Sequence, residues 1–281
     1  MTECIVCNNN KNFKNKFEIL LECQVCGHIF ADIKIDFKKI SEIYSDKYFF
    51  GDEYIDYIDD KKQIEKNSLI RNRLIKKYTL GLKIKKLYEI GCAYGFFLNK
   101  VRRDYNVIQG IDVNKNAIIF ARENFNLSLD SGDFLNLKYN SFFNIFCMFD
   151  VIEHLDKPNL FLNKINQIAE KNSYLFLTTG DIKSYNARFK GKKWRLIHPP
   201  THIHYFSKKS ITKLLNKYNF DVIYIQYNGS YRNLNFILNK IPFYKKYFNW
   251  FNAILKFFKL DKFDLYINLY DIMFVVAKKN E

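Results

Sequence analysis

A short apolar stretch that leads into a glycine loop and then into a helical pattern constrains the fold of this chain most strongly. Residues 85–90 predict a strand, Gly91-Cys-Ala-Tyr-Gly95 predicts a tight loop, and residues 96–103 predict the start of a helix. Strand, glycine loop and helix in this order form the first unit of a nucleotide-binding α/β fold. The sequence therefore predicts a doubly wound α/β domain around a mostly parallel sheet.

The spacing of the loop residues distinguishes between two classes of cofactor. An NAD fingerprint has glycines at relative positions one, three and six, whereas here Ala93 and Phe96 occupy positions three and six. The acid Glu89 lies two residues before Gly91, and Gly95 lies four residues after Gly91. The loop therefore disfavours NAD and has the pattern acid-x-Gly-x-x-x-Gly.

Another acid follows the second predicted strand. Residues 107–113 predict this strand, and Asp112 lies near its end, 17 residues beyond the last glycine of the loop. An acid at that place can accept hydrogen bonds from both hydroxyls of a ribose. A predicted helix at residues 116–124 then leads to Gly132-Asp133-Phe134. Each acid alone fits a solvated turn or a helix cap equally well, but their order after successive strands favours one shared ligand.

Polar clusters follow the fourth and fifth predicted strands. Residues 142–149 are continuously apolar, as in a buried central strand, and Asp150, Glu153 and His154 come directly after them. Residues 174–179 predict the fifth strand. It is followed by a polar and aromatic segment that contains Trp194, His198, Pro199, Pro200, Thr201, His202, His204, Tyr205 and Phe206. Because ligands bind outside the carboxyl ends of such strands, both clusters are candidate acceptor sites.

Together these motifs resemble the class I S-adenosylmethionine-dependent methyltransferases of the methyltransferase-11, -12 and -23 groups. Asp150-x-x-Glu153-His154 is similar to their D/E-x-x-E-H stretch, which ubiquinone-type O-methyltransferases share. The segment from Trp194 to Phe206 is similar to a W-x(n)-P-P-x-H-x-x-Y-F stretch of methyltransferases that modify sugars and other small molecules. The resemblance covers roughly residues 44–279, including the approach at residues 48–57.

The resemblance implies a seven-stranded, Rossmann-like sheet and a set of cofactor contacts. Asp133 would accept from the adenine amino group and Phe134 would lie against the ring. The implied cofactor-binding residues are Glu89, Gly91, Cys92, Ala93, Gly95, Asp112, Val113, Asp133, Phe134 and Asp150.

The candidate catalytic residues are His154, His202 and Glu153. Methyl transfer to a hydroxyl is an in-line displacement that needs alignment and a base. His154 is either that base or a residue that caps a helix, and His202 is a base or a substrate ligand. By the same resemblance Asp150, Glu153 and His154 match a divalent-ion site, which makes Mg²⁺ a further candidate. Glu153 fits the first turn of a helix equally well.

Four cysteines near the N-terminus predict a metal knuckle. Cys4, Cys7, Cys23 and Cys26 form two C-x2-C pairs separated by 15 residues. Two such turns complete a tetrahedral, structural Zn²⁺ site. Two disulfides or four unrelated thiols are the alternatives, which a reducing compartment and the paired spacing disfavour. We expect a zinc-ribbon-like module at residues 1–40 and the methyltransferase domain at residues 41–281.

The C-terminal part completes the expected sheet. Residues 211–218 predict a helix, and residues 221–227 and 271–277 predict the sixth and the antiparallel seventh strand. Between them, at about residues 230–262, lies a helical aromatic insertion with interspersed lysines. Such a helix could contact an anionic membrane surface or pack as a lid or dimer face.

Composition limits the class of partner. The formal charge of +16 is spread along the chain as lysine, which disfavours a dedicated nucleic-acid site. A signal peptide and a membrane span are not apparent, so we expect a cytoplasmic protein. The oligomeric state is left open.

The expected reaction is O-methylation of a small molecule or saccharide, such as a nucleotide sugar or a surface-glycan component. C-methylation of a nucleotide-linked keto-sugar is the first alternative, because that family also joins a four-cysteine zinc module to this core. A ribosomal RNA methyltransferase and a scaffold that binds the cofactor without catalysis are the others.

Overall fold

The computed structural model describes residues 3–33, 42–43, 57–138, 142–238 and 263–280. The strands are β1 (Phe13–Phe17), β2 (Leu20–Cys23), β3 (Ile29–Ala31), β4 (Lys86–Ile90), β5 (Val107–Asp112), β6 (Asp130–Ser131), β7 (Phe143–Phe149), β8 (Ala169–Gly180), β9 (His204–Tyr205), β10 (Phe220–Tyr227), β11 (Ser230–Asn233), β12 (Asp264–Ile267) and β13 (Ile272–Lys279). The helices are α2 (Lys61–Tyr78), α3 (Phe96–Val101), α4 (Lys115–Phe125), α5 (Pro158–Ile168), α6 (Tyr185–Lys190), α7 (Lys208–Lys217) and α8 (Leu234–Leu238).

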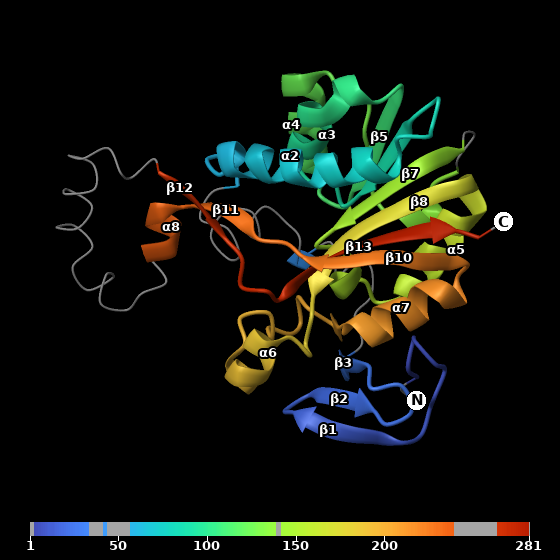
Figure 1. Ribbon diagram of the computed structural model, residues 1–281, viewed down its shortest axis with the longest axis vertical. Helices are drawn as coiled ribbons and strands as arrows, with labels where there is room; N and C mark the ends of the chain where they lie inside the picture. Colours follow the sequence, from blue (N-terminus) through green and yellow to red (C-terminus); the bar gives the residue numbers. More distant parts are fainter. Residues whose placement is uncertain (1–2, 34–41, 44–56, 139–141, 239–262, 281) are drawn as a thin grey trace.

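A seven-stranded sheet forms the centre of the molecule. Its order is β10-β13-β8-β7-β4-β5-β6, and β8, β7, β4, β5 and β6 run parallel. Strand β13 is antiparallel to both of its neighbours, β8 and β10. Helices α2, α3 and α4 lie on one side of the sheet, and α5 and α7 lie on the other (Figure 1). This arrangement confirms the predicted doubly wound, mostly parallel sheet.

The sequence explains why these segments form a buried sheet with capped helices. All seven residues of β7, Phe-Asn-Ile-Phe-Cys-Met-Phe, are buried, as in a strand covered on both faces. Helix α4 begins where the Asn114 side chain accepts from the Ala117 N–H at 2.9 Å. Helix α7 begins with a capping box between Ser207 and Ser210. Each cap satisfies backbone donors that the first helical turn leaves unpaired.

The N-terminal strands join the main domain through a second, four-stranded sheet. Its order is β1-β2-β3-β9, so β3, which follows the cysteine knuckle, pairs with β9 from the connection that follows β8. Ile29 lies opposite Tyr205, and the Ala31 N–H donates to the Ile203 carbonyl at 2.8 Å. Cys4 and Cys26 belong to the same hydrophobic cluster as the central sheet. The knuckle is therefore packed onto the α/β core (Figure 1).

Buried Asp271 anchors the long connection between β8 and β9. Its Oδ2 accepts from Trp194 Nε1 at 2.9 Å and from Asn186 Nδ2 at 2.7 Å. Its Oδ1 accepts from Arg195 Nη2 at 2.8 Å, and its backbone carbonyl accepts from the Asp181 N–H at 2.8 Å. These bonds hold the connection against the sheet just before β13 begins.

Two predicted boundaries differ from the structure or fall outside its described part. Strand β8 begins at Ala169, five residues before the predicted start, because a register irregularity between Phe143 and Ile145 lengthens its pairing with β7. The domain boundary at residue 40 and the approach residues 48–51 lie outside the described residues.

The aromatic insertion lies mostly outside the described residues, and its helical character and membrane contact stay predictions. Within it, β11 pairs antiparallel with β12 and α8 follows β11. Among the described helices, none has the length and apolar character that a bilayer span requires.

Candidate functional site

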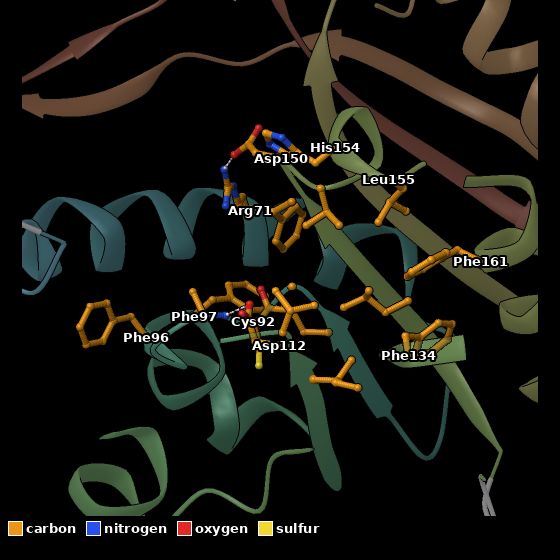
Figure 2. Close-up of a pocket in the computed structure, with 18 of the residues that line it drawn as sticks. Arg71, Cys92, Phe96, Phe97, Asp112, Phe134, Asp150, His154, Leu155 and Phe161 are labelled. Carbon is orange, nitrogen blue, oxygen red and sulfur yellow. Dashed lines mark hydrogen bonds and ion pairs between the residues drawn. The ribbon is translucent and has the colours of Figure 1, made fainter. Parts of the chain in front are cut away.

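A cavity of about 570 Å³ opens at the carboxyl ends of β4, β5 and β7. Its volume falls in the range typical of small-molecule and cofactor sites. Figure 2 shows Cys92 and Asp112 on one side of this cavity and Asp150 and His154 on the other. Nine of the ten predicted cofactor residues line this cavity: Glu89, Gly91, Cys92, Ala93, Asp112, Val113, Asp133, Phe134 and Asp150. The tenth residue, Gly95, is not part of the cavity lining and directly precedes α3.

The glycine loop has the backbone conformation that its sequence predicts. Gly91, Ala93 and Gly95 all have positive φ angles, of 76°, 44° and 70°. A Cβ atom at Gly91 would collide with the side chain of Val151, so this position requires glycine. Ala93 adopts the left-handed region despite its methyl group, which is a conformation that residues other than glycine rarely adopt. The loop thus brings bare backbone to the edge of the cavity.

Asp112 is tied to this loop at the end of β5. Its Oδ2 accepts from the Ala93 N–H at 2.7 Å, and its Oδ1 accepts from the Asn114 N–H at 2.9 Å. Burial raises the pKa of Asp112, and these backbone donors oppose that rise. Each carboxylate oxygen has a second acceptor position, so the side chain can still accept from a bound diol.

Glu89 is a buried acid with an unpaired oxygen. Its Oε2 has no hydrogen-bond partner among the described residues. Burial raises its pKa to about 8, the Arg71 charge opposes this rise, and the Asp112 charge adds to it. A carboxyl group with a raised pKa can release its proton when a positively charged ligand binds, and the resulting carboxylate then balances the charge of that ligand.

Asp133 and Phe134 close the other end of the cofactor side. Asp133 Oδ1 accepts from the Leu135 N–H at 2.9 Å, and its Oδ2 accepts from Asn136 Nδ2 at 3.1 Å. The Phe134 ring is buried and stacks on Phe161 at a centroid distance of 5.4 Å. Asp133 is thus also the cap of a short 3₁₀ helix, as the alternative interpretation of this acid expected.

Asp150 lies across the cavity, in a strained position after β7. Its φ is 57°, and its carboxylate accepts from Arg71 Nη2 and from Thr178 Oγ1, both at 2.8 Å. The Arg71 guanidinium also lies 4.5 Å from the centre of the Phe149 ring. Burial raises the pKa of Asp150, but the charge of Arg71 and these hydrogen bonds outweigh it, so that the net shift is downward. Figure 2 shows this ion pair at the edge of the cavity.

The three predicted catalytic residues come together beside Asp150. One ligand-type atom from each of Glu153, His154 and His202 lies within 4.8 Å of the other two. His154 lines the cavity, and the His154 and His202 rings meet edge to face at 4.5 Å. Burial lowers the pKa of His154 to about 4 and that of His202 well below its ordinary value. Both rings are therefore neutral at pH 7.

The resemblance implied Asp150, Glu153 and His154 as ligands of Mg²⁺, but these three residues do not form one convergent group. The carboxylate of Asp150 is directed to Arg71 and Thr178, and the convergent group contains His202 in its place. A hard ion such as Mg²⁺ binds mainly oxygen atoms, whereas two of these three side chains offer nitrogen. The residues present therefore do not fit a Mg²⁺ site.

Part of the cavity wall comes from segments that the sequence interpretation did not select. Arg71 and Asn67 come from α2, and Ser230 and Arg232 come from β11. The polar face of a helix that carries Arg71 has the same pattern as an ordinary solvated face. The sequence therefore contained no signal that would have identified these four residues.

The four knuckle cysteines converge at the other end of the molecule. Cys4 and Cys26 have their Sγ atoms 3.5 Å apart, and so do Cys7 and Cys23. All four Sγ atoms lie within 4.8 Å of one another. Tetrahedral Zn²⁺ with bonds of about 2.3 Å requires sulfur separations of roughly 3.8 Å. The donor set and its spacing therefore fit a structural zinc ion.

Known structures share this fold. Magnesium protoporphyrin IX methyltransferase from Synechocystis, determined with bound SAH, aligns with a TM-score of 0.56 at 11% identity, over 87% of this chain and 100% of that one. A SAM-dependent methyltransferase from Archaeoglobus fulgidus aligns with a TM-score of 0.51 at 18% identity, over 79% of this chain and 99% of that one. At these identities the similarity establishes the fold alone.

Comparison of sequences identifies the family. The mitochondrial ubiquinone biosynthesis O-methyltransferase of Dictyostelium discoideum is 25% identical over an alignment of 142 residues, which covers 44% of this chain and 43% of that protein. The chain thus matches less than half the length of this relative. A family model described as a methyltransferase domain matches residues 60–225, more than half of the 281 residues. The chain therefore belongs to the methyltransferase-domain family, and these residues form its S-adenosylmethionine-dependent methyltransferase domain.

Proposed function

We propose that the protein transfers a methyl group from S-adenosylmethionine to an oxygen atom of a small molecule or saccharide, such as a nucleotide sugar or a surface-glycan component. The observation that carries this proposal is the division of one cavity into two unlike walls. The glycine loop and Asp112 form one wall, and Asp150 and His154 form the other. A cofactor and a small acceptor can meet between them.

The cofactor wall suits an adenosyl group and an amino acid tail. Asp112 has acceptor positions left for the ribose hydroxyls, and Asp133 and Phe134 are placed to contact the adenine. Glu89 and the bare backbone at Gly91 lie at the methionine end, where the cofactor carries positive charge. The bound SAH of the Synechocystis methyltransferase supports the use of this cofactor.

The acceptor wall suits the removal of a proton from a hydroxyl. When bound, S-adenosylmethionine supplies an electrophilic methyl group, and the electron pair of the broken C–S bond stays on sulfur. An acceptor oxygen attacks that methyl carbon in line and loses its proton. Glu153, His154 and His202 are the residues we assign to orienting this oxygen and receiving its proton.

We also propose that the cysteine knuckle holds a structural Zn²⁺ ion and that the protein acts in the cytoplasm. Four of the cysteines converge as one metal-type donor set, an arrangement typical of proteins from reducing compartments.

Replacing Asp112 tests the cofactor wall. We expect Asp112→Ala to weaken S-adenosylmethionine binding by about 100-fold, because two hydrogen bonds to a charged acceptor are lost. Isothermal titration calorimetry measures the change, and Asp130→Ala, on an exposed aspartate of β6, serves as a control that should bind like the wild type. Wild-type protein that binds neither S-adenosylmethionine nor its demethylated product would contradict the proposed function.

The raised pKa of Glu89 predicts that cofactor binding depends on pH. Below a pKa of about 8 the folded protein holds this proton, and the positive charge of the cofactor favours its release. The affinity should therefore rise from pH 6 to pH 8, by up to about tenfold per pH unit. Because the pKa of Glu89 is higher in the folded protein than in the unfolded chain, the free energy of unfolding of the cofactor-free protein should fall as the pH rises from the ordinary glutamate pKa toward 8.

Two charged groups near Glu89 could also contribute to the pH dependence of cofactor binding, and their contribution must be separated from that of Glu89 itself. Arg71 and Asp112 both act on its pKa, but Glu89→Gln should remove the pH dependence while leaving these two residues in place. Calorimetry at pH 7 in two buffers of different ionisation enthalpy measures the released proton. An equal pH dependence in wild type and variant would assign the effect to another group.

Methyl transfer itself is tested with labelled cofactor and fractionated cell metabolites. We expect one class of small hydroxylated molecules to gain one methyl group, as detected by mass analysis. His154→Ala should lower the turnover of that acceptor by roughly 100-fold or more, with cofactor affinity nearly unchanged. Full activity of His154→Ala would remove this residue from the catalytic group.

Loss of one knuckle thiol is expected to destabilise the whole chain. Cys26→Ser removes a metal ligand, and because the knuckle packs into the main core, the free energy of unfolding should fall by at least about 3 kcal/mol. Denaturant unfolding measures this, and the thiolate-to-metal charge-transfer absorption of the Co²⁺-loaded protein reports the site. Cys147→Ala, outside the knuckle, should keep that absorption, whereas its equal loss in both variants would contradict the assigned ligands.

A further inference from the structure

His154 of the acceptor wall belongs to a convergent group whose composition differs from the expected hard-ion set. Glu153 and His154 belong to a short 3₁₀ helix, Ile152–His154, that follows β7. His202 comes from the connection between β8 and β9, about fifty residues later. All three side chains are buried, and their ligand-type atoms lie within 4.8 Å of one another.

Hydrogen bonds determine which nitrogen of each ring is presented to this group. The Nδ1 atom of His154 lies 2.8 Å from the Thr201 carbonyl, and Nδ1 of His202 lies 2.8 Å from the Leu196 carbonyl. A carbonyl oxygen only accepts, so each Nδ1 carries the proton of its neutral ring. The Nε2 atom of each ring is then the one with a lone pair. Histidines that bind metals are typically held in this way, with the second nitrogen donating to a carbonyl.

Glu153 contributes an oxygen that the described residues leave without a hydrogen bond. Its side chain is 4% exposed, and its Oε2 is buried and unpartnered. Burying such an acceptor without a partner is unfavourable. A metal ion accepts a lone pair from a carboxylate oxygen and from an imidazole nitrogen alike, so one cation can bind all three side chains together.

The backbone around the group is braced before any ligand arrives. The Ile203 N–H donates to the Glu153 carbonyl at 2.9 Å, and the His154 N–H donates to the Val151 carbonyl at 2.9 Å. The first of these bonds connects the 3₁₀ helix to the segment that carries His202. The three side chains are therefore held on two mutually bonded segments.

We propose that Glu153, His154 and His202 bind one divalent transition-metal ion of the Zn²⁺ class. Two imidazoles and one carboxylate suit zinc and similar borderline ions, and they disfavour Mg²⁺ and Ca²⁺, which bind mainly oxygen. This site is separate from the cysteine knuckle, so the chain has places for two metal ions of different ligand type.

The position of the site gives the ion a role at the acceptor, and this part of the inference rests on the proposed function. His154 lines the cavity opposite the cofactor wall. A metal ion there would bind the acceptor oxygen, lower its pKa and allow its proton to pass to solvent water. The three side chains assigned to the acceptor oxygen would then act on it as ligands of the ion.

The binding part is tested on the full-length, tag-free protein without cofactor or acceptor. After equilibration with Zn²⁺ and gel filtration, metal analysis should give two ions per chain. Loading with Co²⁺ should give intense thiolate charge-transfer bands from the knuckle and separate, weaker visible bands without thiolate character. Millimolar Mg²⁺ should displace neither ion.

Variants of the ligands and of a neighbouring imidazole give the matched comparison. Glu153→Gln and His202→Gln should each weaken the second ion by more than about 100-fold, so that one ion per chain remains. His198→Gln is the control, because its ring lies 3.9 Å from His202 but is not one of the three ligands, and it should retain two ions. Circular dichroism and calorimetry with S-adenosylmethionine check that each variant is folded.

Three results would overturn the site. The first is a wild-type protein that binds one ion only, with thiolate bands alone. The second is a second ion that survives both ligand substitutions or that is lost equally in folded His198→Gln. The third is displacement by equimolar Mg²⁺, which would contradict the class of ion. Cofactor binding is measured separately, so two bound ions in a protein without cofactor affinity would support the site and refute the proposed methyl transfer.

Discussion

The parallel pairing of β4 with β5 and β7 is the constraint on which both walls of the cavity depend. Glu89 in β4 lies opposite Gly110 on one side and Cys147 on the other. The three strands therefore end together, and the acids at their carboxyl ends emerge at one edge of the sheet. A slip of one residue in any strand would turn its buried side chains to the opposite face, so the register is strongly specified. The cavity is thus a consequence of how the core packs.

The acids at this edge are distinguished by what compensates their charge. Backbone donors stabilise the Asp112 carboxylate, and Arg71 stabilises that of Asp150. Glu89 and Glu153 lack compensation of this strength, and burial raises the pKa of each to about 8. For Glu153 the nearby negative charge of Asp150 adds to this rise. The ion pair between Asp150 and Arg71 therefore has two effects. It directs the Asp150 carboxylate away from the group that contains Glu153, and it keeps Asp150 negatively charged, so that this charge still raises the pKa of Glu153.

The sequence was sufficient to predict those parts of the structure that depend on local pattern. The apolar run of β7, the glycine loop before α3 and the two C-x2-C pairs each have a local physical cause, and all three features lie where expected. The partner of Asp150 could not be predicted in this way. Arg71 reaches it from α2, 79 residues earlier, and nothing in a helical pattern indicates which polar residue will face a cavity. The same limit applies to Arg232 on β11.

The connection between β8 and β9 shows why the candidate catalytic group is held from two sides. On one side Ile203 bonds to the 3₁₀ helix that carries Glu153, and on the other the neighbouring strand β9 pairs with β3 of the N-terminal sheet. His28 and His204 meet across this pairing, with Nε2 and Nδ1 3.2 Å apart. A module that precedes the methyltransferase domain in sequence thus supports the backbone next to His202. Because Cys23 ends β2, the strand paired with β3, the cysteine knuckle and the acceptor wall are connected through one continuous set of backbone hydrogen bonds.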